Sequence, residues 1–197
     1  MRTLLMLLLI VLTSGCKPIL KTVYGIKDPA VETDSSVKEY LVKKRVDTTN
    51  VLTFPTVFSF AMASEQNYLI FPDALFFNKE GYFVPYKSTA QTCNANVSKF
   101  IDDLKNFSSH PADQSRKLSE LESYLQLKKT EPAADITVFI TWTKYSGRLN
   151  KTKAFEWVRA LEKAKKDGIS LNYYLLNCDF QKKWNIPDDQ LKSMMKL

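Results

Sequence analysis

Three cysteines, Cys16, Cys93 and Cys178, are the residues of this sequence with the clearest capacity for covalent chemistry. A cysteine acts as a nucleophile, a metal ligand or half of a disulfide through its thiolate. Cys93 and Cys178 lie far apart in the chain and do not form a Cys-x-x-Cys pair. In an oxidising compartment the two could form one disulfide. Two free, buried thiols fit equally well, because a free cysteine packs as a small hydrophobic side chain.

Other signatures of catalytic and metal sites are missing from the sequence. His110 is the only histidine, which argues against a Ser-His-Asp triad and against a zinc site. The acidic pairs Asp102-Asp103 and Asp188-Asp189 are sequence neighbours, and neighbours on a helix point about 100° apart rather than toward one substrate. No glycine-rich phosphate loop is present. We therefore expect no metal, no cofactor and no conventional enzyme.

The first 16 residues have the layout of an export signal. Leu4 to Leu12 is an unbroken apolar run of nine residues, too short for a membrane span of roughly 20 residues. Leu12-Thr13-Ser14-Gly15-Cys16 resembles a bacterial lipobox, which implies diacylglycerol on Cys16 and cleavage before it. This predicts a signal peptide over 1–15, a lipidated tether over 16–33 and a chain anchored to a bacterial membrane in the cell envelope, at the periplasmic face or in the outer membrane. The alternative is an ordinary signal peptide that ends near a cysteine.

The composition favours a globular domain with a basic surface. Apolar residues make up 45% of the chain and charged residues 25%, which is typical of folded proteins. The formal charge of +7 falls to +6 when Arg2 is removed with the signal. Because an exported protein rarely meets nucleic acid, we expect no nucleic-acid partner. A solvated basic face, or a weak attraction to anionic lipid, is the interpretation we favour.

Hydrophobic periodicity predicts a single domain over 34–197 that mixes helices and strands. Helices are expected over 34–46, 94–107, 114–127, 151–166 and 187–195, and strands over 51–61, 69–77, 82–86, 136–142 and 169–176. Residues 144–149 are expected to form a loop. The strand, helix and strand of the last third predict a right-handed βαβ unit with parallel strands.

The stretch from Ile136 to Ile186 resembles the central part of thioredoxin-like proteins. Val138 to Trp142 stands where that family has its central apolar strand, and Ser146 to Leu149 falls where it carries Cys-x-x-Cys. Phe71 to Gly81 resembles the strand and turn that begin with the family's cis-proline, but it precedes the other half. The resemblance implies a three-layer α/β/α sandwich with a mixed sheet and a circularly permuted order. It also implies that residues 69–77 lie antiparallel and adjacent to 136–142, with Pro72 facing Ser146. A generic α/β sandwich is the alternative.

The same resemblance implies a binding or accessory module without redox activity, because serine and leucine replace the two thiols. The matching surface, which holds extended peptide in active members, comprises Lys144, Tyr145, Ser146, Gly147, Arg148, Leu149 and Pro72. Lys144 and Arg148 would make it basic and suit an acidic or peptide-like protein partner in the envelope. Two alternatives stay open. One is an unusual thiol-disulfide oxidoreductase that uses Cys178 or Cys93, and the other is a purely structural envelope lipoprotein.

Overall fold

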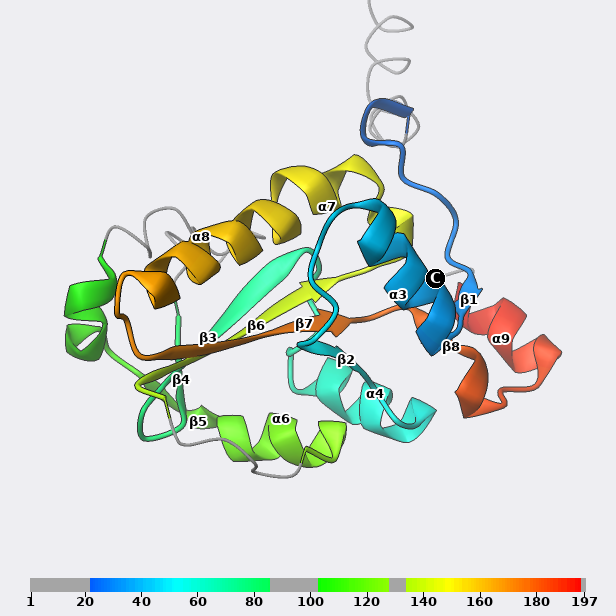
Figure 1. The fold of residues 1–197 in the computed structure, drawn as a ribbon. Helices are drawn as coiled ribbons and strands as arrows, with labels where there is room; N and C mark the ends of the chain where they lie inside the picture. Colours follow the sequence, from blue (N-terminus) through cyan, green and yellow to red (C-terminus); the bar gives the residue numbers. More distant parts are fainter. Residues whose placement is uncertain (1–21, 86–102, 128–133, 196–197) are drawn as a thin grey trace, which may run out of the picture.

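The computed structural model describes residues 22–85, 103–127 and 134–195 (Figure 1). In chain order the elements are β1 (Val31–Glu32), α3 (Asp34–Lys43), β2 (Val51–Thr53), α4 (Val57–Glu65), β3 (Asp73–Asn78), β4 (Tyr82–Val84), η1 (Leu104–Ser109), β5 (Asp113–Lys117), α6 (Leu118–Leu125), β6 (Ile136–Trp142), η2 (Lys144–Ser146), α7 (Arg148–Thr152), α8 (Ala154–Lys166), β7 (Leu171–Asn177), β8 (Phe180–Gln181), η3 (Lys182–Trp184) and α9 (Asp188–Met195).

A mixed sheet of six strands organises the described chain, in the order β2-β7-β6-β3-β4-β5. The neighbours β2, β7 and β6 run parallel to one another. The remaining pairs, β6 with β3, β3 with β4 and β4 with β5, are antiparallel. A short separate pair of parallel strands, β1 and β8, lies beside the main sheet. The protein is therefore an α/β fold with a mixed sheet, as the alternation of predicted helices and strands indicated.

Helices cover both faces of the sheet (Figure 1). One face packs against α3 and α8, whose buried side chains include Val37, Leu41, Phe155 and Leu161. The opposite face packs against α4 and α6, with Trp184 from η3 in the same cluster. The strand β6 supplies both cores, because successive side chains of a strand point to opposite faces. All seven of its residues are buried, as its predicted apolar character requires of a central strand.

The predicted antiparallel pairing of residues 69–77 with 136–142 is confirmed for residues 73–77, whereas the predicted strand is wrong over 69–72, since Pro72 cannot donate to a strand ladder and β3 begins after it. β3 lies antiparallel to β6 in a register that runs from Asp73 opposite Thr141 to Asn78 opposite Ile136. β6 and β7 are parallel and joined by α7 and α8, which confirms the parallel strands of the predicted βαβ unit. The hairpin of the first half of the chain thus completes a sheet whose centre comes from the second half.

The predicted strand over 51–61 is wrong beyond Thr53. Only residues 51–53 form β2, and α4 begins at Val57. Pro55 cannot donate to a strand ladder, and the Thr56 hydroxyl accepts a hydrogen bond from Ser59 N at 3.0 Å, which caps the new helix. The capping signal therefore outweighed the β-branched and aromatic composition of this stretch.

The predicted helix over 114–127 is also wrong at its start, because Asp113–Lys117 form the edge strand β5 and α6 begins at Leu118. The Arg116 guanidinium stacks over the Phe83 ring of β4, 3.9 Å from its centroid, a contact between strands that no local pattern encodes. The predicted loop over 144–149 contains η2 and the start of α7. Of the predicted helix over 94–107, residues 94–102 lie outside the described residues, as does Cys93, and residues 104–109 form the 3-10 helix η1.

Cys16 and the predicted signal peptide lie outside the described residues as well. Within the described ranges, no helix has both the length and the apolar character needed to cross a membrane.

Candidate functional site

The candidate site forms where the parallel strands β6 and β7 end, because the carboxyl ends of parallel strands meet at one edge of a sheet. Four polar side chains, Thr143, Asn177, Asp179 and Gln181, are buried there. The Asp179 carboxylate accepts hydrogen bonds from Lys144 N at 2.8 Å and from Asn177 Nδ2 at 2.7 Å. These bonds attach the first residue of η2 to the segment that follows β7.

Burial is the main influence on the Asp179 carboxyl. Desolvation raises the pKa of Asp179 from 3.8 to about 6, against the opposing effect of the hydrogen bonds from Lys144 N and Asn177. This carboxyl is therefore protonated in the folded protein at mildly acidic pH, where an ordinary aspartate is charged.

Ser146, where the expected thioredoxin-like resemblance would place the first cysteine, is buried and only 5% exposed. Its Oγ lies 2.5 Å from the Oγ1 of Thr143, so the two hydroxyls form a hydrogen bond with each other. Asn150 Nδ2 donates to the Thr143 carbonyl at 2.6 Å and thereby anchors α7 to the end of β6. Leu149, where the same resemblance would place the second cysteine, is half-buried in α7. Ser146 and Leu149 therefore contribute to the packing of the loop, and the Ser146 hydroxyl is held within it.

The chain's own N-terminal segment, residues 22–32, lies along this loop, and we call it the strap (Figure 1). Lys27 N donates to the Tyr145 carbonyl at 2.9 Å, and Arg148 Nη1 donates to the Val23 carbonyl at 3.4 Å. The Lys144 ammonium forms a salt bridge with Glu32. The strap ends in β1, which pairs with β8 directly after Asp179. Lys144 and Arg148 are thus engaged by the protein itself, where the sequence suggested a basic surface open to a partner.

Gly147 lets the strap approach the loop closely. It has φ +60°, and a Cβ added to it would lie 2.2 Å from the Gly25 carbonyl oxygen and 2.6 Å from the Tyr24 carbonyl oxygen. Both the backbone conformation and the space require a residue without a side chain.

The Pro72 segment borders the same loop. Pro72 follows a cis peptide bond directly before β3 and is buried. The Phe71 ring packs edge-on against Tyr145, with centroids 5.9 Å apart. Thr141 of β6 holds the segment, since its Oγ1 lies 2.5 Å from the Ile70 carbonyl oxygen and accepts from Asp73 N at 3.1 Å. The structure therefore brings the Pro72 segment and the 144–149 loop together through the ring contact of Phe71 with Tyr145.

Cys178 does not have the environment of a reactive thiol. It is 3% exposed, and its Sγ donates to the Leu176 carbonyl at 3.5 Å. Burial, with a smaller effect of the Asp179 charge, raises the pKa of Cys178, so the thiol stays protonated near neutral pH. Among the described residues, no group of three His, Cys, Asp or Glu side chains is placed to hold a metal ion.

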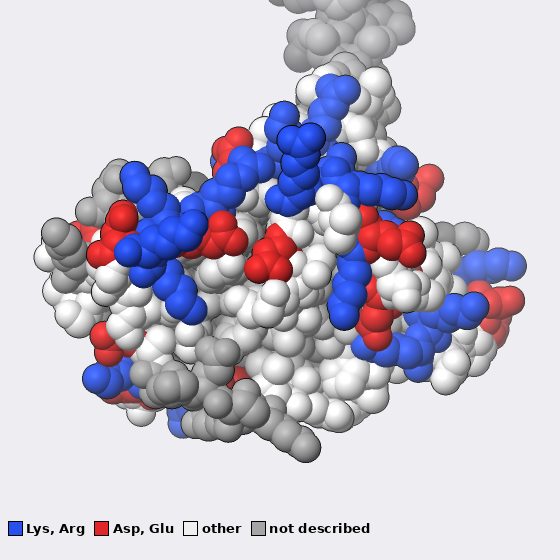
Figure 2. Space-filling model, viewed as in Figure 1, with Lys and Arg blue, Asp and Glu red and all other residues white. Residues whose placement is uncertain are grey.

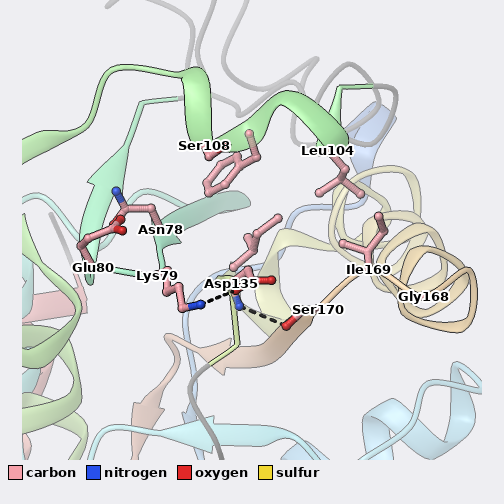
Figure 3. A pocket seen from close by; sticks show the side chains of 11 residues that line it. Asn78, Lys79, Glu80, Leu104, Ser108, Asp135, Gly168, Ile169 and Ser170 are labelled. Atoms are coloured by element: carbon pink, nitrogen blue, oxygen red, sulfur yellow. Dashed lines mark hydrogen bonds and ion pairs between the residues drawn. The ribbon is translucent and has the colours of Figure 1, made fainter.

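A hollow of about 400 Å³ lies at the end of β6 and β7 opposite the candidate site (Figure 3). Lys79 and Asp135 close an ion pair across it at 3.3 Å, and Asp135 N donates to Ser170 Oγ at 3.2 Å. None of the residues predicted for the site lines this hollow.

Comparisons with protein-family models, with curated proteins and with solved structures found no match. The site therefore has to be interpreted from its own geometry.

Sequence reasoning missed the residues that build the site, namely Thr143, Asn150, Asp179 and the strap. A usable signal existed for Asp179, because Asn177-Cys178-Asp179 places two polar residues directly after an apolar strand. The strap gave no local signal, since its partners lie more than 100 residues away in the chain.

We expect Gly147→Ala to lower the free energy of unfolding by about 1–3 kcal/mol, the usual cost of a non-glycine residue in a disfavoured backbone region. It should also release the strap, which hydrogen exchange would detect as faster exchange of the Lys27 amide. Gly168→Ala is the matched control, because Gly168 has φ +90° but open space around its Cα. Unchanged exchange at Lys27 in Gly147→Ala would contradict the close approach described here.

The raised pKa of Asp179 predicts a specific pH dependence. Between about pH 4 and pH 6 the folded protein retains a proton that the unfolded chain releases, so the free energy of unfolding falls as pH rises through this interval. Asp179→Asn should remove this slope, since its amide oxygen can still accept from Lys144 N and it does not titrate. Urea unfolding measures how much the free energy of unfolding changes over this pH interval. The change in the wild type should exceed the change in Asp179→Asn by on the order of 3 kcal/mol.

Asp47→Asn serves as the control, because the hydroxyl and amide of Thr49 lower the pKa of Asp47. The contribution of the Asp47 carboxylate to stability is lost only as pH falls below about 4. The free energy of unfolding of Asp47→Asn should therefore change between pH 4 and pH 6 as it does in the wild type. Parallel slopes for the wild type and Asp179→Asn would show that the buried carboxyl does not titrate in this range.

Proposed function

We propose that this protein is a bacterial lipoprotein, anchored to a membrane of the cell envelope through Cys16, whose domain is thioredoxin-like, lacks redox activity and acts as a binding or accessory module. The anchor rests on the apolar run Leu4–Leu12 followed by Thr13-Ser14-Gly15-Cys16. The finer description of the fold rests on the order of the strands.

Three features of the sheet support the thioredoxin-like description. Parallel β7 and β6 are joined by a helical segment, β6 is followed antiparallel by β3 and β4, and a proline stands directly before β3. In that family the proline strand follows the strand that corresponds to β7, whereas here it precedes β6 in the sequence. A circularly permuted chain keeps the same neighbouring strands in its sheet. Such a change is tolerated when the termini lie close together at the surface.

The burial of Ser146 and its hydrogen bond to Thr143 are the main support for a domain without redox activity. Thiol-disulfide exchange begins with attack by an exposed thiolate. At the loop after β6 the protein has a buried hydroxyl bonded to Thr143, with the strap across the neighbouring backbone. Cys178, the described thiol, is buried and protonated. These contacts argue against the alternative of an oxidoreductase that uses Cys178.

The position of the strap favours one particular form of accessory role. The loop that would hold a partner's peptide holds residues 22–32 of the same chain. The loop therefore serves first as the docking place of the tether, and a partner that binds there must displace the strap. This is also the observation that favours the second candidate, a structural lipoprotein whose domain is held close to its anchor.

The anchor predicts that Cys16→Ala abolishes incorporation of a labelled fatty acid and stalls processing of the precursor. Cys178→Ser is the control and should be labelled like the wild type, because its sulfur is buried. Labelling of the protein in cells followed by gel electrophoresis measures both. If Cys16→Ala is processed and partitions into detergent like the wild type, an ordinary signal peptide is the correct interpretation.

The absence of redox activity predicts that the chain from Lys17 onward reduces insulin disulfides no faster than a sample without protein, with thioredoxin as the positive control. The double variant Cys93→Ser with Cys178→Ser should behave identically apart from any loss of stability. Clear insulin reduction that disappears on replacing either cysteine would overturn the proposal and establish the oxidoreductase.

A further inference from the structure

The helices α7 and α8 carry a basic face that the packing of the domain leaves in solvent. Residues 148–166 contain seven Lys and Arg against two Glu, a formal balance of +5. The exposed cations are Arg148, Lys151, Arg159, Lys163, Lys165 and Lys166. The buried side of α8, with Phe155 and Leu161, packs on the sheet and so directs these cations outward.

These cations have no carboxylate partner in the part of the chain that the structure describes, although Arg148 donates to the Val23 carbonyl. Among residues 22–85, 103–127 and 134–195, none of the six cations forms an ion pair with a carboxylate. One of the two glutamates, Glu162, accepts a hydrogen bond from the Tyr173 hydroxyl at 2.9 Å. The face therefore presents an excess of positive charge to whatever lies opposite it.

The basic face adjoins the start of the strap. Figure 2 shows a band of Lys and Arg that runs over α8 and α7 toward the point where the described chain begins. Arg148 contacts the Val23 carbonyl, which ties α7 to that point directly. Val23 and Tyr24 are 54% and 37% exposed, and a half-exposed tyrosine beside basic residues suits the polar boundary of a bilayer.

The tether limits how far this face can be from the anchor. Six peptide units separate Cys16 from Thr22, and they span at most about 20 Å when fully extended. Electrostatic attraction to an anionic surface acts over a Debye length of about 8–10 Å. A chain held by Cys16 thus keeps the start of the strap, and Arg148 beside it, within about 20 Å of the anchored residue, a distance that permits the basic face to reach the headgroups.

We propose that the basic face of α7 and α8, together with Val23 and Tyr24, rests on the anionic phospholipid headgroups of the bilayer that holds the protein. The inference rests on the proposed anchoring at Cys16. It specifies how the anchored domain is oriented. α7, α8 and the strap face the membrane, whereas α4, α6 and α9 lie on other sides of the domain (Figure 1).

The test uses the mature chain from residue 16 with Cys16→Ser, so that no lipid is attached, and vesicles with about one third phosphatidylglycerol in phosphatidylcholine. Sedimentation should show binding to these vesicles, no binding to pure phosphatidylcholine, and loss of binding as salt is raised. Lys163→Glu with Lys165→Glu and Lys166→Glu should weaken binding about tenfold or more.

The matched control is Lys117→Glu with Lys182→Glu and Lys192→Glu, which changes the net charge equally at exposed positions on β5, η3 and α9. It should stay within about twofold of the parent protein if the face, rather than the net charge, is recognised. A second variant with glutamine at Lys163, Lys165 and Lys166 should give an intermediate loss, and it covers the case in which glutamate destabilises the last turn of α8.

Equal losses in the α8 variants and the control, or no binding to anionic vesicles, would overturn the inference. These outcomes are separate from failure of the anchor. Absent vesicle binding with normal acylation of Cys16 rejects the membrane-facing surface alone, and absent acylation with intact vesicle binding rejects the lipid anchor alone.

Discussion

The pairing of β3 with β6 is the contact on which the other parts of this structure depend. Its register runs from Asp73 opposite Thr141 to Asn78 opposite Ile136 and joins segments about 60 residues apart at the centre of the sheet. Both strands are almost wholly buried, so a slip of one residue would turn Phe139 and Phe76 to the wrong faces. The proline segment reaches the end of β6 because of this register.

The same pairing determines where polar groups collect. Thr141 stands opposite Asp73 and binds the backbone on both sides of Phe71 and Pro72, so the Pro72 segment is fixed to the end of β6. Beyond it, Asp179 and Asn150 hold Thr143 and Lys144 in place through charge-assisted and amide hydrogen bonds. The buried polar side chains here bond partly to backbone groups beyond the strand ends, as Asn150 does to the Thr143 carbonyl, and partly to one another, as Asn177 does to Asp179.

This network holds the loop against the strap and turns the Ser146 hydroxyl inward. A catalytic nucleophile at the same place would need an exposed side chain, whereas Ser146 is turned inward and Gly147 offers only backbone to the strap. The absence of a side chain at Gly147 is what allows the Tyr24 and Gly25 carbonyls to come so near. The strap, α7 and the exposed cations of α8 then form one continuous side of the molecule.

The sequence by itself determined the elements whose signals are local. The apolar run Ile136–Trp142, the spacing of Phe155, Val158 and Leu161, and the glycine after the β3 turn are enough to place β6, α8 and the hairpin, because periodicity and turn chemistry act over a few residues. Tertiary structure decided the edge strand β5 and the arrangement of the candidate site. Residues 113–117 became a strand through contact with β4, and the burial of Asp179, the inward Ser146 and the strap on Gly147 depend on segments distant in sequence, whose pairing carries no local pattern.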